Sequence, residues 1–391
     1  MTQVGFRQAD RTAEEGHQAW RAGRGLLPGA GRGDDRRCRG APWSVTRCTG
    51  PRHEEVVMSE RQSEPVGPQV VTALVGDAVR APSMHNAQPW SFRYLTGERL
   101  LHVRADLTRA MPRTDPRHRA LHIGCGAALF NLRVAAAHAG LAADVRVLPD
   151  PADPLLVAVV GLEPGPARTA PEHDLARLHP AIRRRHTSRN PFSETDVPEP
   201  VRQVLREGAS EEGAELVFTD LWHADFMLKL VRDAESRDST DPSSREELEH
   251  WTRLGTEADT AVDGVPEYAF GPRPSEGKAA WRDFAGRRQV ADRGTTAFEH
   301  APHLVLLGTR GDRPADWLCA GQALERVLLE ATLADLATSL SSHSLESSDL
   351  RELTRDPLSG MGHVQMVLRL GYGPQGPATP RRAVRDVLKV V

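Results

Sequence analysis

The ten residues APSMHNAQPW, from Ala81 to Trp90, are the most informative part of this 391-residue chain. A proline near each end fixes the local φ angles, so the amides of Asn86 and Gln88 are presented on a stiff backbone. Amides place donors and acceptors side by side, as does the edge of a flat heterocycle, and Trp90 would supply apolar support. An ordinary turn between a helix and a strand would explain the prolines but not both amides.

Regular elements are predicted on both sides of this loop. The apolar run over residues 70–79 predicts a helix that ends before Ala81-Pro82, because the residue before a proline is pushed out of the helical region. Period-2 patterns and β-branched residues predict strands over 91–95, 100–105, 144–149 and 154–162, with a long helix over 120–138. Further on, helices are predicted over 199–207, 222–235, 245–255 and 318–336, and strands over 214–220, 303–309 and 363–372.

An internal repeat relates the two long helices. Placing IGCGAALFNLRVAAAHAGL, from Ile123, over LCAGQALERVLLEATLADL, from Leu318, gives an offset of 195 residues that superimposes Gly126 on Gly321. Small residues that recur on one helical face permit a close approach between helices. The pattern indicates duplication, although two helices rich in Ala and Leu could also agree through composition alone.

Composition limits the classes of function. The chain has 39% hydrophobic residues, 26% charged residues and a formal charge of −3, which is typical of a soluble globular protein and gives no footprint for nucleic acid. The apolar run from Leu155 to Leu162 is too short for a membrane span, which needs about 20 residues. Four cysteines without a CxxC pair favour a reducing cytoplasm.

The first 57 residues are rich in Arg, Gly and Pro and show little hydrophobic periodicity. Such a segment cannot bury enough apolar surface to offset the entropy of ordering, so residues 1–57 are predicted to be a disordered extension. Translation that begins naturally at Met58 would make them an artefact of start-site assignment, and we expect them to be dispensable. A basic arm that contacts a partner is the alternative.

Two basic segments add a second kind of chemistry. Arg183 to Arg189 reads RRRHTSR, and Arg381 and Arg382 follow a Pro- and Gly-rich stretch near the C-terminus. Clustered guanidinium groups beside hydroxyls offer the fork-shaped donors that a phosphate dianion requires. Taken alone, the first segment is explained better by a solvated basic turn, because short basic runs are common.

Together these residues resemble a known family. PSMHNAQPW matches the PSxxNxQPW loop of the nitroreductase superfamily, RRHTSRNPF is similar to its RRSxRxF segment with Thr187 for Ser, and GYGPQGPATPRRAVRDVL looks like its closing segment. The loop here precedes the arginine segment, which resembles the Acg-like branch, a nitroreductase dimer fused and permuted into one chain. The resemblance covers roughly residues 69–388.

The resemblance implies an α+β fold of two fused pseudo-symmetric halves, each with a mixed or antiparallel sheet and helices. The halves would span residues 58–170 and 171–391. It also implies one FMN site in each chain, because no second loop and no second arginine segment is found. The implied cofactor contacts are Pro82, Ser83, His85, Asn86, Gln88, Pro89 and Trp90 from the first half, and Arg185, Thr187, Arg189, Glu346, Arg381 and Arg382 from the second. Ser347 follows Glu346 where the family has glycine, which puts close backbone approach to the flavin in doubt.

Rival signals are weaker. Gly371 to Gly376 satisfies GxGxxG but no helix follows, and GPRPSEGK lacks the spacing of a phosphate loop. His118, His122 and Cys125 have helical spacing, yet no fourth ligand is evident, so no metal site is predicted.

The stretch from Asp238 to Glu299 has little β signal and many Gly, Pro and charged residues, and it is predicted to be a lid insertion or a disordered surface segment. Two functions therefore remain open. The first is an oxidoreductase that passes hydride from NAD(P)H through FMN to a small-molecule acceptor, a nitro compound or a quinone, with no side chain assigned as catalytic. The second is a non-catalytic FMN store whose lid covers the flavin.

Overall fold

Two long helices cross at the centre of the fold: α2 (Arg119–His138) and α9 (Pro314–Leu333). The computed structural model describes residues 66–165, 174–277, 282–286, 288, 290, 293–355 and 359–391. These residues belong to one compact unit, Arg61–Val391. The predicted disorder of residues 1–57 lies outside the described ranges. So does the predicted boundary between residues 170 and 171, which stays a prediction.

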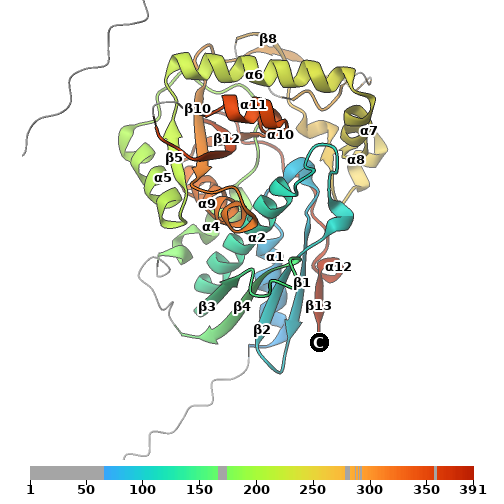
Figure 1. The fold of residues 1–391 in the computed structure, drawn as a ribbon, viewed down its shortest axis with the longest axis vertical. Coiled ribbons are helices and arrows are strands. Elements are labelled where there is room, and N and C mark those ends of the chain that lie inside the picture. The colour runs from blue at the N-terminus through green and yellow to red at the C-terminus, as the bar shows by residue number, and fades with distance from the viewer. Residues whose placement is uncertain are drawn as a thin grey trace, which may run out of the picture. The chain divides into compact units, whose positions relative to one another are not determined.

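The helix crossing follows the repeat found in the sequence. A Cβ atom added at Gly126 would overlap the carbonyl oxygen of Leu318, and one added at Gly321 would overlap the carbonyl oxygen of Ile123. Ile123 and Leu318, like Gly126 and Gly321, are separated by the predicted offset of 195 residues. The contact is therefore reciprocal, and it explains why both positions need glycine. Figure 1 shows the two helices together between the two sheets.

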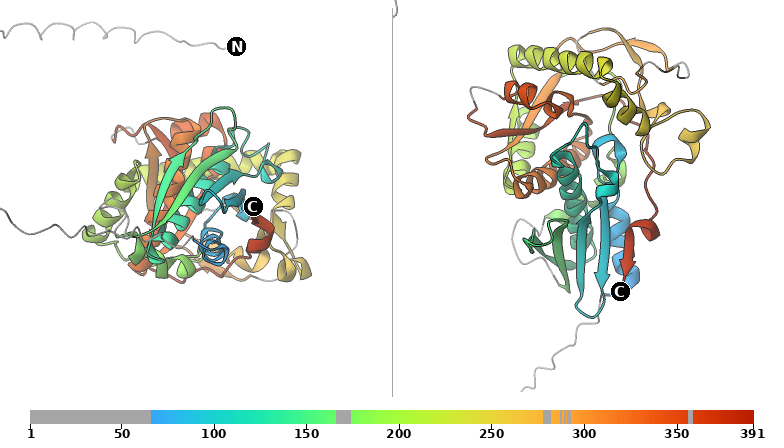
Figure 2. Two further views of the ribbon diagram at one scale, coloured as in Figure 1. Left: turned by 90° about the horizontal axis from the view of Figure 1, so that it is seen from below. Right: turned by 45° about the vertical axis from the view of Figure 1, so that its right-hand side comes forward.

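The first half contains a five-stranded mixed sheet in the order β13-β1-β2-β4-β3. The pairs among β1 to β4 are antiparallel, whereas β13 from the C-terminus lies parallel to β1. Figure 2 shows β13 beside β1, so the end of the chain returns to the first sheet. The elements are α1 (Pro68–Ala78), η1 (Met84–Asn86), β1 (Trp90–Leu95), β2 (Leu100–Ala105), η2 (Leu107–Arg109), β3 (Leu141–Val147), β4 (Leu156–Pro164), α12 (Val384–Val387) and β13 (Leu388–Val390).

The second half contains a four-stranded antiparallel sheet in the order β11-β12-β10-β5. One face packs on α9 and α5, and residues of α6 and α10 pack on the other. Its elements are η3 (Leu175–Leu178), α4 (His179–Arg184), α5 (Glu199–Glu211), β5 (Glu215–Phe218), α6 (Leu221–Thr240), β10 (His303–Thr309), β11 (Ala337–Ser341), α10 (His343–Glu346), α11 (Ser348–Leu353) and β12 (His363–Gly371). The α+β fold with two sheet-bearing halves agrees with the prediction.

The insertion over residues 238–299 contains more regular structure than the sequence indicates. It holds α7 (Pro242–His250), β6 (Thr252–Arg253), α8 (Thr256–Thr260), β7 (Val265–Pro266), η4 (Glu267–Ala269), β8 (Arg273–Glu276) and β9 (Thr295–Ala297). It also has a small apolar cluster of its own that includes Val265, Phe270 and Phe284. The predicted helix over 245–255 is wrong at its end, because Trp251 closes α7 and Thr252 enters β6.

The apolar length of α2 would suffice to cross a membrane, but 83% of the relevant window is buried inside the protein. This burial, against α9 and the first sheet, is that of a core helix.

Candidate functional site

A cavity lies where the predicted loop, the arginine segment, the insertion and the C-terminal segment meet. Its empty volume is about 1120 Å³ when the open solvent at its mouth is included. The lining consists of residues 82–86 of the loop, Ala120, Ile123 and Gly124 of α2, Arg185, His186, Thr187 and Arg189 after α4, Val265, Arg282 and Phe284 of the insertion, Leu324, residues 339–343, Met366, Thr379 and Arg381.

The loop takes a conformation that few sequences adopt. His85, Asn86 and Gln88 have φ angles of 48°, 56° and 55°, in the left-handed region that non-glycine residues visit rarely. Asn tolerates this region best, which gives Asn86 a local reason to be there. The Ser83 hydroxyl fixes the turn by accepting a 2.8 Å hydrogen bond from the backbone N–H of Gln88.

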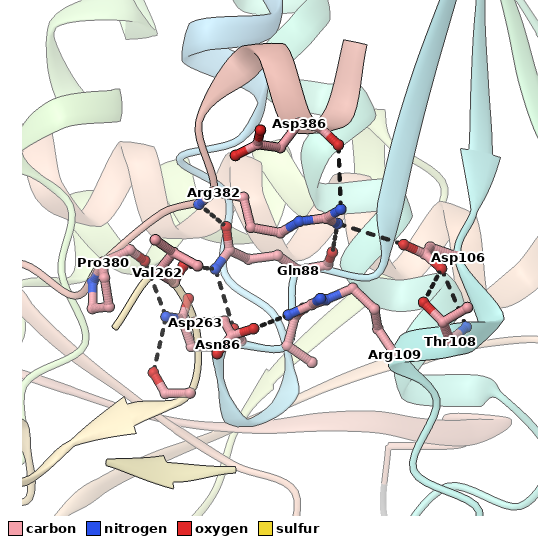
Figure 3. A network of polar contacts seen from close by, with 12 residues as sticks. Asn86, Gln88, Asp106, Thr108, Arg109, Val262, Asp263, Pro380, Arg382 and Asp386 are labelled. Atoms are coloured by element: carbon pink, nitrogen blue, oxygen red, sulfur yellow. Dashed lines mark hydrogen bonds and ion pairs between the residues drawn. The ribbon is translucent and has the colours of Figure 1, made fainter. Parts of the chain in front are cut away.

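The Asn86 amide is fully engaged by the protein. Its Nδ2 donates to the carbonyl oxygens of Gly264 and Pro380, both at 3.0 Å, and its Oδ1 accepts from Arg381 at 2.9 Å. The Gly264 N–H also donates back to the Asn86 carbonyl at 3.3 Å. Asn86 therefore joins the loop to the insertion and to the C-terminal segment, as Figure 3 shows.

Gln88 has a similar role on the side of the loop away from the cavity. Its Nε2 donates to the Val262 carbonyl at 2.9 Å, and its Oε1 accepts the backbone N–H of Arg382 at 2.8 Å. The Arg382 guanidinium lies 3.5 Å from Asp106 and contacts the Gln88 carbonyl (Figure 3). It also contacts the Trp90 carbonyl. These residues hold the outer side of the loop.

A cluster of guanidinium groups adjoins the Asn86 amide, because Arg381 takes part in both. Arg185 Nη2 and Arg381 Nη2 each donate to the Arg80 carbonyl at 3.1 Å. Within the described part of the chain, Arg185 Nη1, Arg381 Nε and Arg80 Nε are buried without a hydrogen-bond partner. Buried donors of this kind are costly unless something else pairs with them.

The electrostatics of this cluster are dominated by burial and by like charge. Burial, then Arg185 and Arg80, lowers the pKa of Arg381 to about 9. Burial and the same positive neighbours lower the pKa of His186 to about 4, so His186 is neutral at pH 7. One acid, Glu325 of α9, faces the cluster with its Oε1 3.5 Å from Arg185 Nε. Burial raises the pKa of Glu325 to about 7 against the opposing pull of Arg185.

Thr187 and Arg189 fasten the arginine segment to its surroundings. Thr187 forms an isolated parallel bridge with Thr338 of β11. The Arg189 guanidinium donates to the Ala269 carbonyl at 2.8 Å and lies 4.6 Å from the centre of the Phe284 ring. Burial lowers the pKa of Arg189 to about 10. Arg189 thus connects the second half to the insertion across the cavity wall.

Arg282 of the insertion lines the remaining cavity wall and contacts several residues near it. Its guanidinium pairs with Glu346, lies 3.2 Å from Asp238, and donates to His85 Nε2 at 3.1 Å. His343 Nε2 lies 2.7 Å from the same Asp238 carboxylate. The ligand atoms of Asp238, His343 and Glu346 are within 4.8 Å of one another, as in a metal site, but Arg282 already supplies a positive charge there.

The predicted site residues divide into two groups. Eight line the cavity: Pro82, Ser83, His85, Asn86, Arg185, Thr187, Arg189 and Arg381. Five lie outside the lining: Gln88, Pro89, Trp90, Glu346 and Arg382. Pro89 packs near Gly124, and Trp90 is in the core of the first half. Direct contact of all thirteen with a flavin stays a prediction.

Sequence reasoning missed Arg80, His186, Arg282, Glu325 and His343. Arg80 and His186 adjoin predicted residues, so their positions carried a weak signal. Glu325 is one of several charged residues of α9 that are buried, and no periodicity identifies which of them meets Arg185.

Comparisons with known proteins give the family. No family model matches the sequence. In Mycobacterium tuberculosis H37Rv, the protein named "Putative NAD(P)H nitroreductase acg" is 32% identical over 329 residues, which cover 82% of this chain and 96% of that protein. "Putative NAD(P)H nitroreductase Rv3131" from the same strain is 32% identical over 327 residues, covering 82% and 91%.

Solved structures give lower similarity. A "putative nitroreductase" from Anabaena variabilis has a TM-score of 0.36 and 13% identity, covering 78% of this chain and 73% of its own. A nitroreductase with bound FMN from Bacteroides fragilis has a TM-score of 0.32 and 14% identity, covering 52% and 92%. The sequence relatives, matched over nearly their full length, show that this chain belongs to the acg family of nitroreductase-like proteins.

Proposed function

We propose that this chain is an oxidoreductase that binds one FMN in the cavity and passes hydride from NAD(P)H to a small-molecule acceptor, a nitro compound or a quinone, in the cytoplasm. The observation that carries the proposal is the buried guanidinium cluster of Arg80, Arg185 and Arg381 with its unpaired donors. The names of the relatives in Mycobacterium tuberculosis, with NAD(P)H as reductant, support the same reaction class.

The charge of the cluster suits a phosphate dianion. The charged neighbours of Arg381 are Arg185, Arg80 and Glu325, so the three guanidinium groups and one carboxylate carry a surplus of two positive charges when that acid is ionised. A phosphate carries close to two negative charges at pH 7 and three acceptor oxygens, so it matches both the surplus and the unpaired donors. The cavity residues therefore fit the phosphate end of FMN.

The rest of the cavity suits an aromatic ring. Ile123, Leu324 and Met366 offer apolar surface from the two halves, and Val265 and Phe284 offer it from the insertion. FMN bound there would supply the hydride-accepting centre. The protein would bind and orient the ring and exclude water.

A second candidate function is FMN storage. It is favoured by the contacts that draw the insertion over the cavity, namely Asn86 to Gly264, Arg189 to Ala269, and Arg282 to Glu346. If these contacts exclude nicotinamide, the flavin would be held without turnover.

One experiment tests the proposal and separates it from storage. Purified protein is saturated with FMN, freed of excess and mixed with NADPH or NADH without oxygen. We expect bleaching of the flavin absorbance and a ratio of one released FMN per chain after denaturation. Retained FMN without bleaching would support storage, and a ratio near two or one-half would contradict a single site in each chain.

A further inference from the structure

The His85 ring lines the cavity in an arrangement that fixes which nitrogen carries its proton. His85 Nε2 lies 3.1 Å from Arg282 Nη1. A guanidinium can only donate a hydrogen bond, so His85 Nε2 must accept and carries no proton. In the neutral ring the proton is then on Nδ1.

That Nδ1 is a donor with no partner among the described residues. The side chain is 7% exposed, and Nδ1 is buried. An unpaired buried N–H is destabilising, and an acceptor atom of a ligand would remove that cost. The left-handed φ of 48° at His85 places the ring against the cavity at a backbone cost, which is typical of functional loops.

The neutral state of His85 agrees with its surroundings. Burial and the positive charge of Arg282, with His343 and Arg189 behind it, hold the pKa of His85 well below its ordinary value of 6.5. Arg282 is itself held by Glu346 and Asp238, and the Phe284 ring packs edge-on at 5.5 Å. The ring therefore has little freedom to turn over.

Building on the proposed function, we infer that His85 donates a hydrogen bond from Nδ1 to an acceptor atom of the flavin ring, and that Arg282 is the positioning residue that fixes this tautomer. The ring is the portion of FMN that fits the side of the cavity formed by Phe284 and Val265, whereas the phosphate fits the cluster of Arg185 and Arg381. His85 would then favour ligands that carry a hydrogen-bond acceptor at this edge of the ring.

The test compares FMN with riboflavin, which has the ring but no phosphate. His85→Ala should weaken the binding of both ligands by the same factor, about five- to tenfold. His85→Asn keeps an N–H donor near the position of Nδ1 and tolerates a positive φ, so binding should return to within about twofold of the unmodified protein. His102→Ala, on a partly exposed strand position, is the matched control and should leave both affinities unchanged.

A second measurement reads the tautomer directly. In protein labelled with ¹⁵N-histidine, long-range ¹H–¹⁵N spectra should show the His85 proton on Nδ1, and this signal should shift when FMN is added. Arg282→Met should give a mixture of tautomers.

The outcomes separate the two proposals. If neither ligand binds the unmodified protein, the proposed function and this inference both fail. If both bind but His85→Ala leaves riboflavin affinity unchanged, or the proton lies on Nε2, only the inference is overturned.

Discussion

The loop amides and the guanidinium cluster differ in how their hydrogen bonds are satisfied. The amides of Asn86 and Gln88 have partners in the insertion and the C-terminal segment for every group described above. The guanidinium groups of Arg185 and Arg381 retain buried donors without partners among the described residues. Satisfied groups hold a scaffold, and unsatisfied buried groups indicate where a ligand binds. The difference separates residues that build the site from residues that are available to FMN.

The largest effect should come from the guanidinium groups with unpaired donors. If Arg185 binds the FMN phosphate as proposed, Arg185→Ala removes charge-assisted hydrogen bonds that are each worth about 1.5–3 kcal/mol. We therefore expect about 100-fold or greater loss of FMN affinity, with little change for riboflavin, measured by fluorescence titration. Arg185→Lys keeps the charge but not the two-pronged donor geometry of the guanidinium, so its FMN affinity should lie between those of the unmodified protein and Arg185→Ala. Equal losses for both ligands would mean that Arg185 supports the fold instead.

The next effect concerns Glu325. Its pKa is raised to about 7 from an ordinary value of 4.5, so the folded protein binds this proton more tightly than the unfolded chain. Its contribution to stability is fully present below pH 4.5 and is lost as the pH rises to about 7. At 1.36 kcal/mol for each pKa unit this amounts to about 3 kcal/mol.

Glu325→Gln should remove that pH dependence. Urea unfolding between pH 4.5 and 8 is expected to give a flatter profile for this variant than for the unmodified protein. Glu207→Gln, an exposed position on α5, is the matched control and should leave the profile unchanged. Parallel profiles for all three proteins would show that Glu325 does not titrate in this window.

The smallest of the three effects should come from the loop amides, whose hydrogen bonds are satisfied. Asn86→Ala leaves the carbonyls of Gly264 and Pro380 without their donor and should lower the free energy of unfolding by about 1–3 kcal/mol. Flavin binding should weaken for FMN and riboflavin alike, and more than in Gln203→Ala, whose side chain is exposed.

Asn86→Gly separates the lost side chain from the strained backbone, because glycine adopts φ of 56° without penalty. An FMN loss in Asn86→Ala as large as that of Arg185→Ala, with unfolding unchanged, would contradict the scaffold role.

Local patterns in the sequence predicted much of the fold. The lengths of α2 and α9 and the pairing of Gly126 with Gly321 depend on helical periodicity and small residues, which are visible in one dimension. The strand β13 was missed because its three residues are too few to show an alternation of apolar and polar side chains. It is held in place by its pairing with β1. The strand β11 was missed because ATSLS follows a helix closely and alternates weakly.

The site was only partly predicted for the same reason. The positions of Asn86 and Arg185 followed from their motifs, but which donors stay unpaired depends on partners distant in sequence. Of the two adjacent arginines near the C-terminus, Arg381 lines the cavity and Arg382 contacts Asp106, and no sequence pattern distinguishes them.

Because α2 and α9 cross within one chain, their contact should not dissociate when the protein is diluted. If the two halves were separate chains, mass action would dissociate them as their concentration fell below the dissociation constant. A covalent connection instead holds each half at an effective concentration on the order of millimolar near the other. Asn86 and Arg185 line one cavity within one polypeptide. If FMN binds there as proposed, its affinity should not depend on the concentration of the protein.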